Sequence, residues 1–105
     1  MEQHLKSLYD YLSEKKCKDI CVYDLSGEEQ GCDFIYVATV NNVANNKKLA
    51  SLIMQDFSIE KYPEGFHKGE WIVFDFEQCV VHLFVGAARD KYNLDKLWKS
   101  KKMAI

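Results

Sequence analysis

The segment from Trp71 to Phe84 is the longest run of strand-forming residues in the chain, and it constrains the fold more than any other stretch. Aromatic and β-branched residues fill it, and one polar pair, Glu77-Gln78, interrupts it. This pattern predicts two antiparallel strands that reverse direction at the polar pair. The predicted cross-strand pairs are Phe76–Cys79, Asp75–Val80, Phe74–Val81 and Val73–His82.

Side chains alternate across a strand, so this hairpin has two distinct faces. The first face carries no polar group and is predicted to belong to the core: Ile72, Phe74, Phe76, Cys79, Val81 and Leu83. The second face is also apolar but holds an acid and an imidazole: Trp71, Val73, Asp75, Val80, His82 and Phe84. The second face is therefore either covered by another element or open to a partner.

Elsewhere the sequence predicts helices and strands of ordinary length in a single domain, 1–105. The expected elements are a helix at 2–16, strands at 20–25 and 34–40, a helix from Asn41 or Asn42 to about 57, a loop at 61–69, and a last short helix starting near Asp90 or Asn93. We expect an α+β fold in two layers, with two helices on one face of a mixed, mostly antiparallel sheet and the other face partly open.

Charge is unevenly distributed along the chain. The net charge of −2 argues against a general nucleic-acid binder. The segment 89–105 has six basic and two acidic residues, which gives +4, and the rest has eight basic and fourteen acidic, which gives −6. An acidic body with a basic C-terminal segment suits a protein partner lying beside RNA. A lysine-rich helix end that keeps the chain soluble explains the same pattern.

The four cysteines, Cys17, Cys21, Cys32 and Cys79, form no Cys-x-x-Cys pair. We also see no signal peptide, arginine-rich transit peptide or apolar run of membrane length. These features predict free thiols and a bacterial cytoplasm as the compartment. A zinc site built from Cys17, Cys21 and a histidine lacks the usual ligand spacing.

Three strand-borne acids, Asp24, Asp33 and Asp75, could serve a metal-dependent nucleotidyl transfer. That chemistry normally needs two acids two residues apart on one face. Ile35 occupies the position two after Asp33, and Glu77, two after Asp75, falls in the predicted turn. We therefore favour solvated or loop-capping acids over a metal site. A contact between His82 and Asp75 could form a general base, but the sequence places no nucleophile beside it.

Three aromatic residues, Trp71, Tyr92 and Trp98, remain as candidates for partner binding. Trp98 lies at helical spacing from Leu94 and is expected in the core. Trp71 begins a strand on the mixed face, and tryptophan is common among binding hot spots. The polar loop 26–31, with a glycine near each end, is a further candidate for a working loop.

Several motifs together resemble the ribosomal silencing factor family, also called Iojap-related proteins. The matching segments, spread over 19–98, are Asp24-Leu-Ser26, 33–39 (Asp-Phe-Ile-Tyr-Val-Ala-Thr), Glu64-Gly65, 71–75 (Trp-Ile-Val-Phe-Asp), 80–84 (Val-Val-His-Leu-Phe) and Arg89-x-x-Tyr92-x-Leu94-x-x-Leu97-Trp98. The chain departs from the family at Val40-Asn41-Asn42, where Gly-Asn-Ser is usual, at the Glu77-Gln78 turn, where Gly-Asp is usual, and at Lys91, where an aromatic residue is usual.

The resemblance implies a fold related to nucleotidyltransferases without their activity or a cofactor. It implies a homodimer in the free state that binds the large ribosomal subunit through ribosomal protein L-fourteen, blocks subunit joining and represses translation when nutrients are short. Trp71 and Phe76 would be contact residues, and we add Asp75, His82 and Tyr92 as candidates. The alternatives are a nucleotidyltransferase-like enzyme using the three acids above, or a large-subunit assembly factor.

Overall fold

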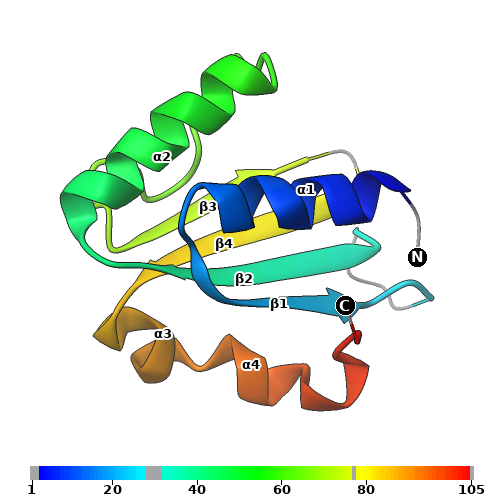
Figure 1. Ribbon diagram of the computed structural model, residues 1–105. Helices are drawn as coiled ribbons and strands as arrows, with labels where there is room; N and C mark the ends of the chain where they lie inside the picture. Colours follow the sequence, from blue (N-terminus) through cyan, green and yellow to red (C-terminus); the bar gives the residue numbers. More distant parts are fainter. Residues whose placement is uncertain (1–2, 28–31, 77, 105) are drawn as a thin grey trace.

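The structure is a computed structural model that describes residues 3–27, 32–76 and 78–104 (Figure 1). Its elements, in order, are α1 (Gln3–Glu14), β1 (Lys18–Asp24), β2 (Phe34–Val40), α2 (Val43–Asp56), β3 (Trp71–Asp75), β4 (Cys79–Val85), α3 (Ala87–Tyr92), α4 (Leu94–Leu97) and a short 3-10 helix, η1 (Lys99–Lys101). The strand predicted at 34–40 is confirmed to the residue. The other predicted helices and strands are confirmed with small shifts at their ends, except that two helices, α3 and α4, occupy the region of the single last helix expected near Asp90 or Asn93. Most of the candidate loop, residues 28–31, lies outside the described residues.

The hairpin predicted around the polar pair is confirmed, with the register that follows from a turn at that pair. In the structure β3 pairs antiparallel with β4, with Trp71 opposite Phe84, Val73 opposite His82 and Asp75 opposite Val80. The first face of the hairpin packs into the core beneath α1 and α2, where its central residues Ile72, Phe74, Val81 and Leu83 are almost completely buried. Glu77, the first residue of the predicted turn, lies outside the described residues.

The four strands form one mixed sheet in the order β1-β2-β4-β3. The pairs β1–β2 and β3–β4 are antiparallel, whereas β2 and β4 run parallel at the centre. Parallel neighbours need a crossover connection, and α2 supplies it between β2 and the hairpin. The prediction of a mixed sheet is confirmed, but the sequence did not indicate which strands pair in parallel, because strand order depends on contacts between distant segments.

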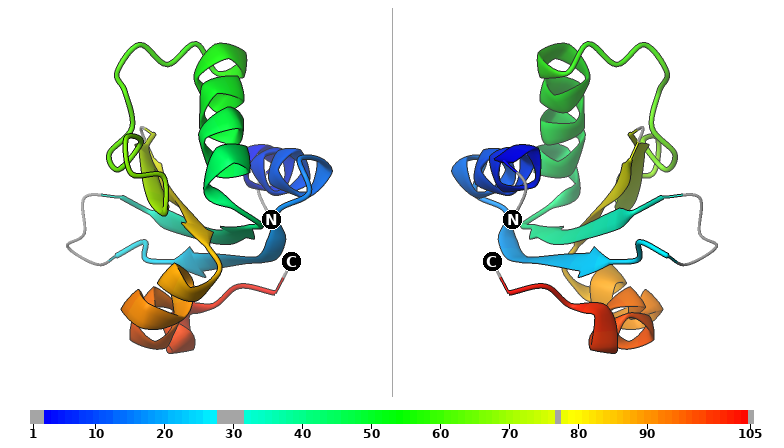
Figure 2. Two further views of the ribbon diagram at one scale, coloured as in Figure 1. Left: turned by 90° about the vertical axis from the view of Figure 1, so that its left-hand side faces the viewer. Right: turned by 90° about the vertical axis from the view of Figure 1, so that its right-hand side faces the viewer.

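The prediction of helices on one face only is wrong. Helices α1 and α2 cover one face of the sheet, and α3 and α4 lie against the other (Figures 1 and 2). The second face of the sheet carries its own cluster of apolar side chains, which α3 and α4 shield from water: Tyr23, Leu25, Ile35, Val37 and Phe84. Leu94 and Trp98 pack against this cluster, so Trp98 is a core contact, as its spacing predicted.

Helix α2 begins at an asparagine cap, as predicted. The Asn42 side chain accepts a hydrogen bond from the Asn45 backbone N–H at 2.8 Å, which satisfies one of the free donors of the first turn. Leu49 and Ile53 face the core as expected. Asn46 is also completely buried, and its Nδ2 donates to the carbonyl oxygens of Gly69 (3.0 Å) and Leu83 (3.1 Å). This asparagine therefore joins α2 to the loop before β3 and to β4.

Two residues outside the named strands, Glu64 and Lys102, each form a single β-bridge with an outer strand of the sheet. Glu64 pairs with Val73 on β3, so the loop at 61–69 contains one bridge and no longer strand. Lys102 pairs with Tyr23 on β1. Gly65 has φ +80°, and a Cβ there would lie 2.0 Å from the carbonyl oxygen of Trp71. The close passage of this loop past β3 therefore requires glycine.

Candidate partner-binding site

Trp71 lies at the start of β3 in a cluster of rings on the second face of the sheet. Its ring stacks on Phe84, with centroids 4.9 Å apart, and meets Tyr92 at 4.5 Å. Its indole Nε1–H donates a hydrogen bond to Nδ1 of His82 at 3.0 Å. The tryptophan that the sequence placed on an open face is thus half-buried, with a fixed orientation.

His82 is buried, with 9% of its surface exposed, and burial lowers the pKa of its imidazole from 6.5 to about 4. The imidazole is therefore neutral near pH 7, and because Nδ1 accepts from Trp71, its proton is on Nε2. The hydrogen-bond partner that the structure gives this residue is Trp71, not Asp75. The structure therefore does not support the hypothesis of a histidine–aspartate base. The His82 imidazole has a structural role, which is to orient the Trp71 indole.

Tyr92, at the end of α3, brings the ring cluster to the surface. It is 49% exposed, and Leu97 on α4 is 70% exposed. An open hollow of about 590 Å³ has five lining residues: Tyr92, Asn93, Leu94, Lys96 and Leu97. We call Trp71, Tyr92, Leu94 and Leu97 the aromatic surface. Large exposed apolar side chains of this kind commonly mark a site where another protein binds.

A partly buried ion pair attaches this surface to the sheet. Arg89 on α3 makes a two-pronged contact with Asp95, with Nε and Nη2 each 2.9 Å from a carboxylate oxygen. Its Nη1 also donates to the Asp19 carbonyl oxygen (2.6 Å) and to Thr39 Oγ1 (2.9 Å). Hydrogen bonds from Arg89, and a weaker contribution from the Tyr23 hydroxyl, lower the pKa of Asp95. The network therefore anchors α3 and α4 to β1 and β2.

Sequence reasoning noted Arg89 only as part of a motif and missed this anchoring role. Arg89 and Asp95 are six residues apart, which matches neither helical spacing at which side chains meet. The left-handed residue Asn93, with φ 46°, turns the chain between α3 and α4 and brings the two side chains together. An asparagine between two helical patterns was the available signal, because asparagine tolerates this conformation.

Phe76 and Asp75 do not join the aromatic surface. Trp71 and Phe76 are five residues apart along an extended segment, about 17 Å, and their side chains lie on opposite faces. Phe76 is half-buried on the first face and meets Phe57 edge-to-face at 5.7 Å. Asp75 is exposed at the far end of β3. The five candidate contact residues therefore form two groups at opposite ends of the strand.

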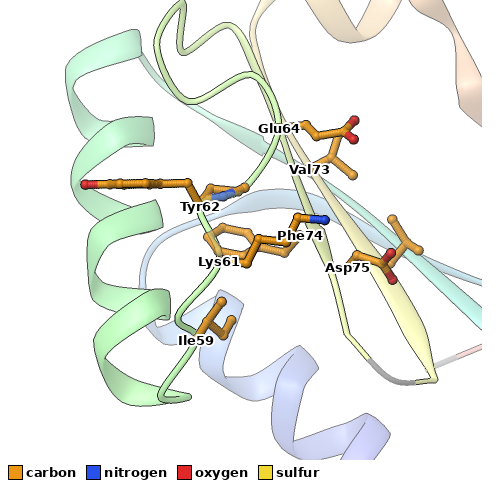
Figure 3. A pocket seen from close by; sticks show the side chains of 9 residues that line it. Ile59, Lys61, Tyr62, Glu64, Val73, Phe74 and Asp75 are labelled. Atoms are coloured by element: carbon orange, nitrogen blue, oxygen red, sulfur yellow. The ribbon is translucent and has the colours of Figure 1, made fainter.

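The exposed end of β3 borders a small pocket of about 160 Å³. Its lining comes from the loop after α2, including Ile59, Lys61 and Tyr62, and from the hairpin, including Asp75. In Figure 3 the Lys61 side chain extends toward β3, on the side where Asp75 lies. The pocket is too small for a nucleotide, so it gives no support to the nucleotidyltransferase alternative.

The three candidate acids lie at one end of the sheet, where β1 and β3 end and β2 begins. Asp24 accepts hydrogen bonds from the backbone and hydroxyl of Ser26, which lower its pKa, so it caps a turn. In the part of the chain that the structure describes, no three histidine, cysteine, aspartate or glutamate side chains are placed to hold a metal ion. Asp33 and Asp75 are exposed.

Other sequence expectations concern the thiols and the membrane. All four cysteines are free thiols, and burial raises the pKa values of Cys17 and Cys79 to about 11. Both are therefore protonated and poorly nucleophilic near neutral pH. Of the helices described, none combines the length and the apolar character needed to cross a bilayer.

Comparison with known proteins places this architecture in a family. The family model described as "Ribosomal silencing factor during starvation" matches residues 1–104. The ribosomal silencing factor RsfS of Treponema pallidum is 30% identical over 94 residues, covering 84% of this chain and 83% of the relative. A crystal structure of a Chromobacterium violaceum protein superposes with a TM-score of 0.79 at 30% identity and covers 100% of this chain and 92% of that one.

A more distant relative is the mouse protein named mitochondrial assembly of ribosomal large subunit protein 1. It is 24% identical over 98 residues, which cover 87% of this chain and 43% of the mouse protein. Three findings agree: the family model matches residues 1–104, the Treponema pallidum protein is 30% identical, and the Chromobacterium violaceum structure has the same fold. This chain belongs to the ribosomal silencing factor family.

Proposed function

We propose that this protein binds the large ribosomal subunit through ribosomal protein L-fourteen and blocks joining of the small subunit by occupying the joining surface. Translation would fall as a result when nutrients are short. Family membership supports a role on the ribosome. The observation that carries the choice of surface is the exposed pair of Tyr92 and Leu97 beside a rigidly held Trp71.

The aromatic surface has the physical properties of a protein-binding site. Trp71 is already fixed by Phe84 and His82, so binding does not need to immobilise it. Tyr92 and Leu97 add exposed apolar area that would lose water on binding. Aromatic residues of this kind dominate the energetics of many interfaces. Such a surface can act by occupancy alone and needs no catalytic residue.

Further parts of the proposal concern the free protein and its surroundings. We propose that the free protein is a homodimer in the bacterial cytoplasm. Its fold is proposed to be related to nucleotidyltransferases without their activity. The basic segment 89–105, which includes α4 and the lysines that follow it, is proposed to face ribosomal RNA beside L-fourteen.

Two tyrosine variants test the choice of surface. Tyr92→Ala should weaken binding to purified large subunits at least about tenfold, because truncating a hot-spot residue costs about 1–2 kcal/mol or more. Tyr62→Ala is the matched control, since Tyr62 is 69% exposed and lines the small pocket beside the hairpin, not the aromatic surface. Co-sedimentation measures binding, and sucrose gradients of mixed subunits measure joining. Equal binding by both variants would remove the aromatic surface from the proposal.

Phe76 and Asp75, at the other end of β3 from Trp71, provide a competing surface. Phe76→Ala is expected to leave subunit binding nearly unchanged, although it should lower stability, because Phe76 packs on Phe57 and Phe74. If Phe76→Ala folds normally and loses binding while Tyr92→Ala retains it, the partner occupies the opposite end of β3.

The large-subunit assembly role remains a second candidate, supported by the name of the mouse relative. The two roles differ in the particle that is bound. A silencing factor should bind mature large subunits and reduce subunit joining. An assembly factor should be enriched on immature particles, and its loss should cause such particles to accumulate. For the enzyme alternative, Mg²⁺ with nucleoside triphosphates should raise the melting temperature only if a site exists.

A further inference from the structure

A groove between the α1–β1 turn and α2 collects positive charge. It measures about 440 Å³, and its charged lining residues are Lys15, Lys16, Lys18 and Lys48. Its other lining residues are neutral: Val40, Asn41, Asn45, Leu49 and Leu52. All four lysines are exposed, and no carboxylate is among the lining residues. In a chain of net charge −2, this is a marked local concentration of one sign.

We propose that this lysine groove binds the phosphodiester backbone of RNA. The inference rests on the proposed function, because a ribosomal partner offers RNA phosphates as the main source of negative charge. Lysine ammonium groups are compact point charges that suit phosphates, and neutralising phosphates releases counterions. The side chains of Asn41 and Asn45, hydrogen-bonded to each other at 2.7 Å, add neutral polar groups at the rim.

The dipole of α1 explains only part of this arrangement. Lysines just beyond a helix C-terminus are favoured by the helix dipole, which accounts for Lys15, Lys16 and Lys18. Lys48 comes from the N-terminal half of α2, where the dipole of that helix does not favour a cation. Two elements far apart in the sequence therefore contribute cations to one groove.

The backbone conformation of Lys16 also supports a role for positive charge in the groove. Its φ is 68°, and the hydrogen bonds Lys16 N–H to Ser13 and Cys17 N–H to Leu12 form the helix-ending motif that usually has glycine at this position. A lysine in the left-handed region carries a steric cost that glycine avoids. Its presence there is consistent with a need for charge at this point of the groove.

A protein partner fits the groove less well than RNA does. Binding to a protein usually depends on exposed aromatic or large apolar anchors. The large hydrophobic residues that the structure exposes are Phe57, Tyr62, Tyr92 and Leu97, and none of them lines the groove. The lysines of the C-terminal segment are placed differently, since Lys101 lies close enough to Asp24 to contribute, after the Ser26 hydrogen bonds, to the lowered pKa of that acid.

The lysine groove and the aromatic surface lie toward the same end of the molecule. This end holds the α1–β1 turn, the start of α2 and the start of α3, and it faces the viewer in the left view of Figure 2. A hollow of about 410 Å³ is lined by Tyr92 of the aromatic surface, by Val43 at the start of α2, and by charged residues that include Lys68, Glu70 and Lys91. One large partner containing protein and RNA could therefore contact both.

The test compares two double variants with the same change in charge. Lys16→Gln/Lys48→Gln alters the groove, and Lys6→Gln/Lys61→Gln removes two exposed lysines elsewhere. Fluorescence anisotropy with a labelled RNA hairpin, over a series of KCl concentrations, measures affinity and its salt dependence. The groove variant should bind RNA at least about tenfold more weakly at low salt, and the slope of log K against log salt should fall by about 1.5. The control variant should match the wild type.

Equal slopes for the two double variants would overturn the proposal. Thermal unfolding checks that each variant folds, and Lys18→Gln/Lys48→Gln repeats the test without changing the left-handed residue. If the groove variant loses the salt-dependent part of subunit binding but binds RNA normally, the groove contacts an acidic protein instead, and the assignment to RNA is wrong. If the wild-type protein binds the RNA hairpin but does not bind large subunits, the proposed function is refuted and the RNA-binding groove is not.

Discussion

Acidification should destabilise this protein through His82. The imidazole is surrounded by the rings of Trp71, Phe84 and Trp98 and accepts a hydrogen bond from the indole. Burial lowers its pKa from 6.5 to about 4, so the folded protein resists protonation that the unfolded chain accepts. The contribution of this histidine to stability is fully present above about pH 6.5 and is lost as the pH falls toward 4.

The size of this effect follows from the two pKa values. Each pKa unit corresponds to about 1.4 kcal/mol, so complete protonation would cost about 3 kcal/mol. Between pH 7 and pH 5 the expected loss in the free energy of unfolding is about 2 kcal/mol. This is a large share of the stability of a small domain, which is about 5–15 kcal/mol. The pKa of Asp95 is lowered in the folded protein, so protonation of this carboxylate should reduce the free energy of unfolding further at more acidic pH.

Urea denaturation at several pH values between 7 and 4.5 measures the effect. His82→Gln should have lower stability at pH 7 but a much flatter pH profile, because the amide does not titrate. His67→Gln is the matched control, since His67 is exposed, and it should keep the wild-type profile. If His82→Gln loses stability with falling pH as steeply as the wild type, the buried neutral imidazole is not the cause and the reasoning is refuted.

Three further substitutions test the contacts that hold the aromatic surface, each by the free energy of unfolding in urea. Gly65→Ala should cost about 2 kcal/mol or more, because its Cβ would lie 2.0 Å from the Trp71 carbonyl oxygen in a left-handed conformation. Arg89→Met should cost about 3 kcal/mol, because it leaves the partly buried Asp95 without its cation. Asn46→Ala should cost about 2 kcal/mol, because two buried carbonyl groups lose their donor.

Matched variants separate these contacts from general effects of substitution. Gly27→Ala has the same left-handed strain, with φ +88°, but no atom within 4 Å of its Cβ, so it should cost only about 1 kcal/mol. Lys96→Met and Asn45→Ala, both at exposed positions, should each cost less than about 0.5 kcal/mol. Equal losses at Gly65 and Gly27 would show that the clash is relieved by small shifts. Equal losses in the other pairs would contradict the roles given to Arg89 and Asn46.

Local features of the fold could be predicted from the sequence because they depend on neighbours in the chain. Alternation with a period of two determined the faces of the hairpin, and the position of the polar pair determined its register, from Trp71–Phe84 to Asp75–Val80. A run of strand-forming residues located β2, and an asparagine before an apolar helical pattern located the start of α2. In each case the controlling contacts are a few residues apart.

The candidate site could be predicted only in part. The alternation rule marked Trp71 as special, and that residue is in the cluster that the structure shows. It could not show that Phe76 lies at the other end of the strand from Tyr92, since the position of α3 depends on the Arg89–Asp95 pair. The burial of Asn46 was also missed, because only tertiary contacts supply the two carbonyl oxygens to which its Nδ2 donates.

By itself, the sequence determined the family resemblance, the strands and the two faces of the hairpin. The tertiary structure decided that β4 lies between β2 and β3, that α3 and α4 cover the second face, and that Lys48 joins Lys16 in one groove. Each of these depends on segments brought together from far apart in the chain. Periodicity shows which face of an element is apolar, but burial of all apolar faces at once selects which elements meet.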